Sequence, residues 1–268
     1  MDRVARTSIS RRRFLVRSAA ATGGLFLLAC GGDEKPVETA TPGVSPKAGG
    51  DTPRPSATPT ASATAAPTGT AAATATAVPL DGPTGFAFPI AGACMPAGEQ
   101  LMPNAPRTYR NGFHEGLDFY PGLACAPIQR GTPILAAKDG TVIRADLNYQ
   151  DITLAQVQEL DAKTKAQGFS DPVTLDIYRG RQVWIDHGGG IVTRHCHMQF
   201  IDPAIKVGVA VKTGTVLGGV GESGTPEFIT AQNTELHLHW ELRVGNSFLG
   251  SGLPPATVRA LYVRVFSR

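Results

Sequence analysis

The histidines of this chain are gathered in short clusters. All six lie between residues 114 and 239, and five of them fall in the segments 114–118, 195–197 and 237–239. Neutral imidazole nitrogens bind zinc and other transition metals, and they exchange protons near neutral pH. Histidine clusters separated by many residues therefore indicate a metal or acid–base site that is assembled from distant parts of the chain.

Two of these histidines have the spacing of neighbours on one face of a β-strand. Residues two apart in a strand point to the same side of the sheet. His237 and His239 are thus expected to project together, whereas Leu238 and Trp240 point into the core. Glu241 lies on the same face as His239, and its carboxylate either orients a ligand imidazole or is a solvated group on the strand.

The same alternation applies to the segment 195–197. It predicts that His195 and His197 share one face and that Cys196, on the other face, is a small buried residue. His195 would then add a third polar ring to the site or lie at its rim. His187 precedes three glycines in a turn, so we expect it to hydrogen-bond backbone groups rather than to bind a metal.

The first cluster combines an imidazole with a carboxylate. His114 and Asp118 project to one side of an extended segment, with Leu117 and Phe119 facing inward. Gly116 leaves room for a metal beside the two ligands. Two imidazoles and one carboxylate form a ligand set that zinc takes in catalytic sites, with the fourth position left for water.

The elements that must position these residues are short strands. From about Phe86 onward, β-branched and apolar runs are broken by glycine, which is typical of an all-β domain. Many short strands with glycine turns predict an antiparallel β sandwich or an open barrel. The expected strands cover residues 134–137, 141–145, 182–186, 191–197, 207–211, 215–220, 235–244 and 262–266.

One stretch, residues 148–180, has a helical pattern and is expected to be an insertion between two strands. Thr153 can cap a helix together with Gln156, and Gly168 can end it. The insertion either covers one wall of a substrate groove or lies on the sheet. In the second case it would bury an apolar face made by Leu154, Val157 and Leu160.

The first 30 residues read as an export signal. They carry a twin-arginine pattern at residues 10–15, and their apolar run, 19–29, is too short to span a bilayer, which takes about 20 residues. The sequence Leu-Leu-Ala-Cys that ends at Cys30 resembles a lipobox. It predicts cleavage before Cys30 and lipid attachment to its thiol, so that the protein is exported and anchored to the cell membrane as a lipoprotein. A plain signal peptide that is cut elsewhere is the alternative.

Residues 30–82 follow as a linker rich in Thr, Ala, Pro, Ser and Gly. Such a segment cannot bury enough apolar surface to fold, and it is expected to be a disordered tether with a reach of roughly 40 Å. The formal charge of +3 includes +5 from the first 30 residues (six Arg, one Asp), which leaves about −2 and argues against nucleic acid as a partner. Cys94 and Cys125 both lie in loop-like sequence and could form a disulfide.

These motifs occur in a recognisable order. His-x-Gly-x-Asp, a strand pair around Asp-His-Gly, a Thr-Arg-x-x-His-Met segment and His-x-His-Trp-Glu together resemble the lysostaphin and LytM-type zinc endopeptidases of peptidoglycan. The resemblance covers roughly residues 84–246. It implies an all-β LytM-type domain of the duplicated hybrid motif class at residues 83–268, after a signal peptide at 1–29 and the linker.

The resemblance also implies roles for individual residues. Carried over by position, the ligands of one zinc ion are His114, Asp118 and His239, and the two catalytic histidines that do not bind the metal are His197 and His237. The implied reaction is hydrolysis of the peptide cross-links of bacterial peptidoglycan, with peptidoglycan peptides as partners of a monomer. Where relatives commonly have tyrosine, two residues before the catalytic histidine, this chain has histidine. A catalytically silent domain that binds wall peptide or activates a hydrolase, and a carboxypeptidase or amidase on the same polymer, are alternatives.

Overall fold

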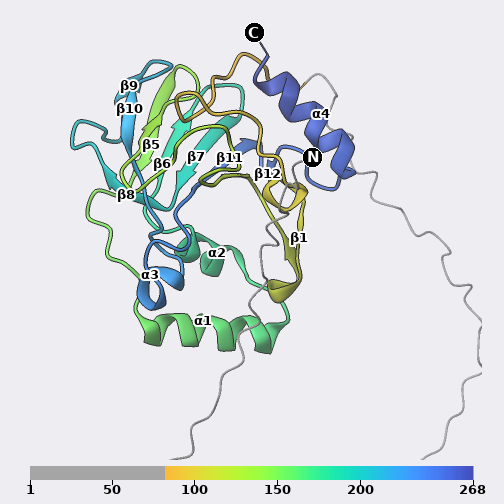
Figure 1. The fold of residues 1–268 in the computed structure, drawn as a ribbon, viewed down its shortest axis with the longest axis vertical. Coiled ribbons are helices and arrows are strands. Elements are labelled where there is room, and N and C mark those ends of the chain that lie inside the picture. The colour runs from red at the N-terminus through yellow and green to blue at the C-terminus, as the bar shows by residue number, and fades with distance from the viewer. Residues whose placement is uncertain (1–81, 268) are drawn as a thin grey trace, which may run out of the picture. The chain divides into compact units, whose positions relative to one another are not determined.

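The computed structural model describes residues 82–267 (Figure 1). The predicted signal peptide, Cys30 and almost all of the predicted linker lie outside the described residues. Within residues 82–267 the chain is built mainly from antiparallel strands with few helices, which confirms the predicted all-β LytM-type fold. No helix in this part of the chain has the length and apolar character that crossing a membrane requires.

The larger sheet has seven antiparallel strands. Six follow one another in the order β12, β11, β7, β6, β5 and β9, and β3 pairs with β11 beyond the end of β12. Their bounds are Leu117–Phe119 for β3, Gly140–Ala145 for β5, Val183–Asp186 for β6, Ile191–Cys196 for β7, Ala210–Val211 for β9, Leu238–Val244 for β11 and Ser247–Phe248 for β12. β11 is therefore an inner strand that joins two partners, β3 and β7, which come from distant parts of the chain.

The remaining strands form a smaller sheet and a hairpin. The smaller sheet has three strands in the order β4, β10 and β8, which span Pro133–Leu135, Val216–Val220 and Met198–Ile201. The main hydrophobic core contains buried side chains from both sheets, among them Leu217 and Trp240. The hairpin consists of β1 (Pro106–Arg107) and β2 (Gly112–Phe113), with the short 3-10 helices η1 (Glu99–Leu101) and η2 (Thr108–Arg110) beside it.

The predicted helical insertion is present between β5 and β6. It consists of α1 (Leu154–Gln167) and α2 (Pro172–Tyr178). Thr153 and Gln156 form the predicted capping box, and Gly168 ends α1 with a φ of 79°. Leu154, however, is 49% exposed, because the buried residues of α1 form a separate small cluster with Ile152 and Tyr178 rather than joining the main core.

The predicted strand at residues 262–266 is wrong. The chain there forms α4 (Pro255–Val265), because its apolar side chains recur at helical spacing and bury one face against the core; they are Val258, Leu261, Tyr262 and Val265. A shorter helix, α3 (Glu227–Thr230), lies in the loop before β11. Cys94 and Cys125 form the predicted disulfide, and Cys196 is a buried free thiol.

Candidate metal centre

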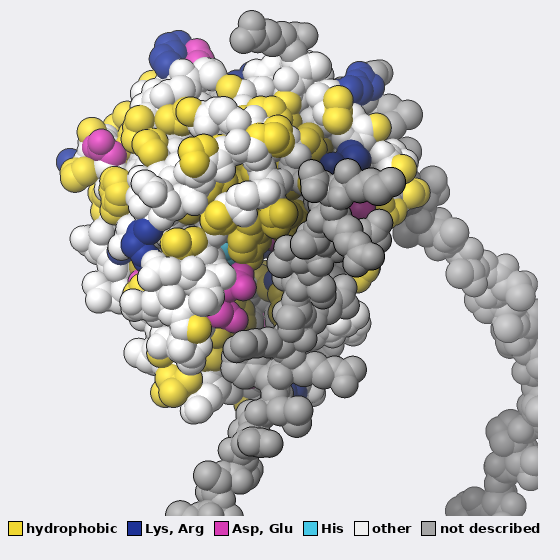
Figure 2. All heavy atoms as spheres, in the orientation of Figure 1, with side chains coloured by type: hydrophobic (Ala, Val, Ile, Leu, Met, Phe, Trp, Pro, Cys, Tyr) yellow, Lys and Arg dark blue, Asp and Glu magenta, His cyan; other side chains and the backbone are white. Residues whose placement is uncertain are grey.

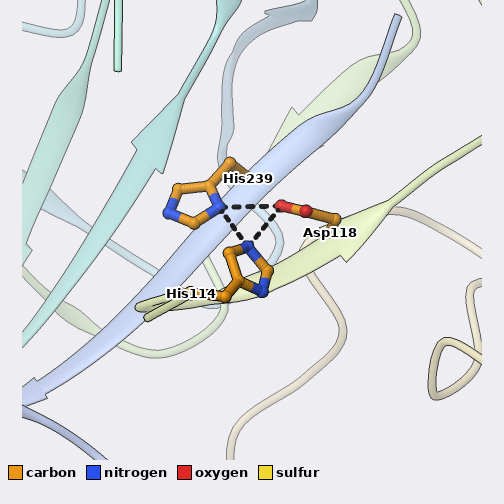
Figure 3. Close-up of side chains that lie close together, drawn as sticks. All are labelled: His114, Asp118 and His239. Carbon is orange, nitrogen blue, oxygen red and sulfur yellow. Dashed lines mark hydrogen bonds and ion pairs between the residues drawn. The ribbon is translucent and has the colours of Figure 1, made fainter. Parts of the chain in front are cut away.

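Three side chains converge from β3, β11 and the segment before β3 (Figure 3). His114 Nε2 lies 2.9 Å from Asp118 Oδ1 and 3.0 Å from His239 Nδ1. His239 Nδ1 lies 2.7 Å from the same carboxylate oxygen. All three residues are buried, and one ligand atom from each lies within 4.8 Å of the others, a spacing at which they could hold one metal ion. These are the three metal ligands that the sequence predicts.

Strand pairing and one glycine bring these ligands together. Asp118 of β3 is directly opposite His239 of β11, which puts the two side chains on the same face of the sheet. A Cβ atom at Gly116 would lie 2.5 Å from the carbonyl oxygen of Trp240 and 2.9 Å from Cε1 of His239. Glycine is therefore needed here because it lets this segment approach β11 so closely, whereas its expected role in leaving room for a metal stays a prediction.

The remaining nitrogen of each ligand imidazole is held by an acceptor. His114 Nδ1 donates to the carbonyl oxygen of Met102 at 2.9 Å, and His239 Nε2 donates to Glu241 Oε1 at 3.2 Å. The two nitrogens that face each other across 3.0 Å then present lone pairs, and a cation between them would stabilise that arrangement. The donor set therefore fits zinc, and the predicted role of Glu241 as a partner that orients a ligand imidazole agrees with the structure.

The surroundings keep two of the three ligands, His114 and Asp118, in the ionisation states that a metal needs. Burial lowers the pKa of His114 to about 4, so its ring is neutral at neutral pH. Burial alone would raise the pKa of Asp118, but the imidazoles of His114 and His239 lower it well below its usual range. A neutral imidazole and an ionised carboxylate are the forms that coordinate zinc. For His239, burial alone would lower the pKa, but hydrogen bonds to Asp118 and Glu241 raise it.

The two histidines with predicted catalytic roles lie beside the ligands. The rings of His197 and His237 are 4.6 Å apart between centroids, and His237 Nε2 is 3.8 Å from Asp118 Oδ1. His197 Nδ1 donates to the carbonyl oxygen of Ser223 at 2.9 Å, and His237 Nδ1 donates to that of Glu235 at 2.7 Å. Burial lowers the pKa of both rings. Each therefore has an unprotonated Nε2 that can accept a proton.

The predicted alternation along residues 195–197 is wrong. β7 ends at Cys196, and His197 adopts a left-handed backbone conformation with a φ of 59°, so its side chain leaves the strand pattern. Cys196 is opposite His239 in the sheet and thus faces the ligand side, whereas His195 is opposite Trp240 and is fully buried. His195 consequently lies neither in the site nor at its rim.

His187 behaves as predicted. Its Nδ1 donates to the carbonyl oxygen of Asp139 at 2.8 Å, and its Nε2 lies 2.9 Å from the hydroxyl of Thr193. It therefore supports the turn between β6 and β7 and takes no part in the cluster of ligands.

Tyr120 is a site residue that the sequence does not reveal. Its ring stacks on His237 at 4.3 Å between centroids with an interplanar angle of 9°. Its hydroxyl donates to Glu235 Oε2 at 2.6 Å, and Glu235 also supplies the carbonyl that binds His237 Nδ1. Tyr120 and Glu235 thus hold the imidazole of His237 from one face and from its edge.

The segment before the first ligand also contributes to the site. It forms the hairpin of β1 and β2 and joins neither sheet, and it supplies the Met102 carbonyl. From the same hairpin, Arg107 Nη2 approaches Asp118 Oδ2 at 3.5 Å and donates to the Gln100 carbonyl at 3.0 Å. Arg107 therefore brings positive charge to the carboxylate oxygen that does not face the histidines.

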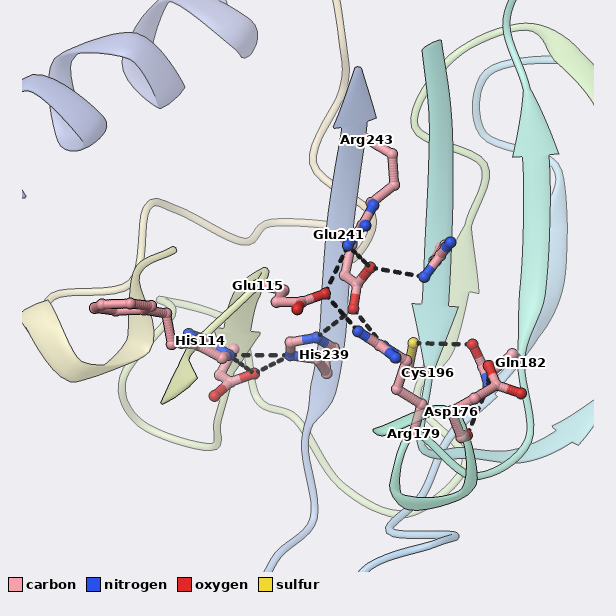
Figure 4. A network of polar contacts seen from close by, with 12 residues as sticks. His114, Glu115, Asp176, Arg179, Gln182, Cys196, His239, Glu241 and Arg243 are labelled. Carbon is pink, nitrogen blue, oxygen red and sulfur yellow. Dashed lines mark hydrogen bonds and ion pairs between the residues drawn. The ribbon is translucent and has the colours of Figure 1, made fainter. Parts of the chain in front are cut away.

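A partly buried network of charged side chains lies next to the ligands (Figure 4). Glu241 is fully buried and forms ion pairs with three arginines, Arg179, Arg194 and Arg243. Glu115 pairs with two of the same guanidinium groups. The alternative in which Glu241 is a solvated carboxylate on the strand is therefore wrong.

On the surface, Figure 2 shows a hollow in which histidine and acidic side chains are visible.

Comparison with known proteins shows which protein family the sequence matches. The family model described as peptidase family M23 matches residues 112–250, more than half of the chain. No curated protein matches. Similar solved structures include a zinc-containing peptidase from Vibrio cholerae, 22% identical over 63% of this chain and 40% of that chain, with a TM-score of 0.39. The chain thus spans less than half the length of that protein.

Two further solved structures are similar over most of their own length. The catalytic domain of lysostaphin from Staphylococcus simulans is 20% identical, with 60% of this chain and 84% of that chain covered and a TM-score of 0.33. A mutant catalytic domain of the prophage-encoded M23 protein EnpA from Enterococcus faecalis is 22% identical, with 58% and 92% covered and a TM-score of 0.33.

Proposed function

This chain belongs to peptidase family M23, and we propose that it is a zinc-dependent endopeptidase that hydrolyses the peptide cross-links of bacterial peptidoglycan. The observation that carries the proposal is the convergence of the three ligand atoms beside two further histidines whose Nε2 atoms have no protein donor or acceptor at hydrogen-bonding distance among the described residues. A metal-binding cluster with adjacent proton acceptors supplies the two functions that metal-assisted amide hydrolysis uses, activation of water and proton transfer.

The residues of the site have two separate chemical roles, metal binding and proton transfer. A zinc ion held by His114, Asp118 and His239 would supply Lewis acidity, which lowers the pKa of water and polarises the amide carbonyl. Since Nδ1 of both His197 and His237 donates to a carbonyl, Nε2 of either ring can take a proton from the attacking water. The protonated ring can then stabilise the oxyanion or pass the proton to the leaving amine.

Localisation and partner are part of the same proposal. The twin-arginine pattern and Cys30 would place the domain outside the cytoplasm on a lipid anchor, and the linker would let it reach peptidoglycan peptides as a monomer. Replacing Cys30 by Ala is expected to move the protein from the membrane fraction to the soluble fraction. Retention of the variant in the membrane fraction would refute the anchor.

The function is tested by zinc content and by digestion of purified cross-linked peptidoglycan. We expect one zinc per chain and conversion of cross-linked dimers to monomers. His239→Ala should abolish both zinc binding and cleavage, whereas His187→Ala, which removes a histidine outside the cluster, should keep them. Shortening of peptide ends without loss of dimers would instead indicate a carboxypeptidase. Bound zinc without any cleavage would indicate a binding or activating domain.

A further inference from the structure

Arg179 lies at the junction between the helical insertion and the metal centre. It is the C-cap of α2, directly before the chain turns into β6, and only 8% of the residue is exposed. Its guanidinium bridges two carboxylates: Nε donates to Glu241 Oε1 at 2.5 Å and Nη2 donates to Glu115 Oε2 at 2.6 Å (Figure 4). A fork of this kind fixes the orientation of both partners as well as their charge.

The oxygen that Arg179 binds is the one that orients a metal ligand. Glu241 Oε1 accepts from both Arg179 and His239 Nε2. The other oxygen, Oε2, accepts from Arg194 at 3.3 Å and from Arg243 at 3.1 Å. Arg179 is therefore the only one of the three arginines that holds the oxygen facing the imidazole.

The backbone of the same segment supports a second histidine. The carbonyl oxygen of Arg179 accepts from the backbone N–H of His197 at 2.9 Å, at the position where His197 takes its left-handed conformation. Two residues later, the backbone N–H of Arg181 donates to Ser223 Oγ at 2.9 Å. Ser223 in turn supplies the carbonyl that binds His197 Nδ1. The end of the insertion thus contacts the supports of one ligand and of one proton acceptor.

We propose that Arg179 is a positioning residue of the metal centre, through which the docking of the helical insertion sets the orientation of His239. The inference rests on the proposed metal site. Residues that orient a ligand typically change metal affinity by about 10- to 100-fold when they are replaced. Arg179→Gln should therefore weaken zinc binding by about tenfold or more.

The direction of this effect separates positioning from simple electrostatics. A guanidinium near a cation site repels the cation, so removal of its charge alone would strengthen zinc binding. Loss of orientation acts in the opposite direction. Arg194→Gln is the matched control, since it removes the same charge from the same carboxylate but from the oxygen that does not face His239.

The test is a titration of the purified full chain with zinc in competition with a chromophoric chelator. We expect wild type and Arg194→Gln to bind zinc with affinities within a few fold of each other, and Arg179→Gln to bind at least tenfold more weakly than both. Equal weakening in both variants, or unchanged or tighter binding in Arg179→Gln, would overturn the positioning role. Failure of the wild type to bind zinc would refute the proposed function instead.

A second variant and a second measurement distinguish a loss of positioning from misfolding of the variant. Arg179→Lys keeps the charge, but a single ammonium group cannot reproduce two donors in a planar fork. It should also weaken zinc binding, and an affinity equal to wild type would overturn the proposal. In the zinc-free protein, the ¹⁵N chemical shift of His239 Nε2 should report a proton on that nitrogen in the wild type and a lower proton occupancy in Arg179→Lys. Identical Nε2 shifts in the two proteins would likewise count against positioning.

Discussion

Replacement of Gly116 by alanine tests how closely the first ligand segment must approach β11. The added Cβ would lie 2.5 Å from the Trp240 carbonyl oxygen, whereas ordinary contacts begin near 3.4 Å. The segment or the strand must therefore retreat by about 0.9 Å, the difference between these two distances. Functional constellations tolerate displacements of only about 0.5 Å, and overpacking of a tight site costs about 1–3 kcal/mol.

We therefore expect Gly116→Ala to lose about 1–3 kcal/mol of unfolding free energy without metal. It should also bind zinc at least tenfold more weakly, because Asp118 and His239 are separated where β3 pairs with β11. Chemical denaturation and chelator competition measure the two effects. The control is Gly112→Ala, since the nearest atoms to its Cβ are at 3.7 Å and it has no positive φ. Wild-type stability and affinity in Gly116→Ala would refute the reasoning.

Three further predictions concern the groups around the metal. His197→Ala and His237→Ala should each retain zinc but lower kcat by about 100-fold or more, because each removes a group for general acid–base catalysis. Loss of zinc in either variant would contradict the position of these histidines outside the ligand set. Tyr120→Phe should keep most activity because the ring still stacks on His237, whereas Tyr120→Ala should reduce kcat with little change in zinc affinity; equal activity of the two variants would argue against the stacking role. Reduction of the Cys94–Cys125 disulfide, which closes a loop with a sequence separation of 31, should lower the unfolding free energy by about 3.7 kcal/mol, measured by denaturation with and without reductant.

Local patterns in the sequence predict much of this structure correctly. The two-residue periodicity places His237 and His239 on the face opposite Leu238, and pairing of β3 with β11 then brings Asp118 to His239 as the ligand set requires. The capping box of α1 is equally local, since each partner lies three residues from the other. These features depend on backbone geometry over a few residues, which the sequence specifies directly.

The errors arise where a local pattern has two readings or is interrupted. Residues 262–266 are mostly β-branched and aromatic, a composition typical of a strand, but the apolar positions from Val258 to Val265 recur at helical spacing, and burial against the core favours the helix. At His197, a left-handed residue ends the alternation that begins in β7. The backbone N–H of this residue donates to the Arg179 carbonyl, a contact across 18 positions that no periodicity reveals.

The four imidazoles of the centre are oriented in the same way. Each has one nitrogen bound by an acceptor, so that its other nitrogen is directed at the site; the acceptors are the carbonyls of Met102, Ser223 and Glu235 and the carboxylate of Glu241. Three of these are backbone groups, which no side-chain substitution removes. Glu241 is the exception, and its carboxylate can rotate unless other donors hold it. The orientation of His239 therefore depends on side chains, and Arg179 provides the contact that fixes the relevant oxygen.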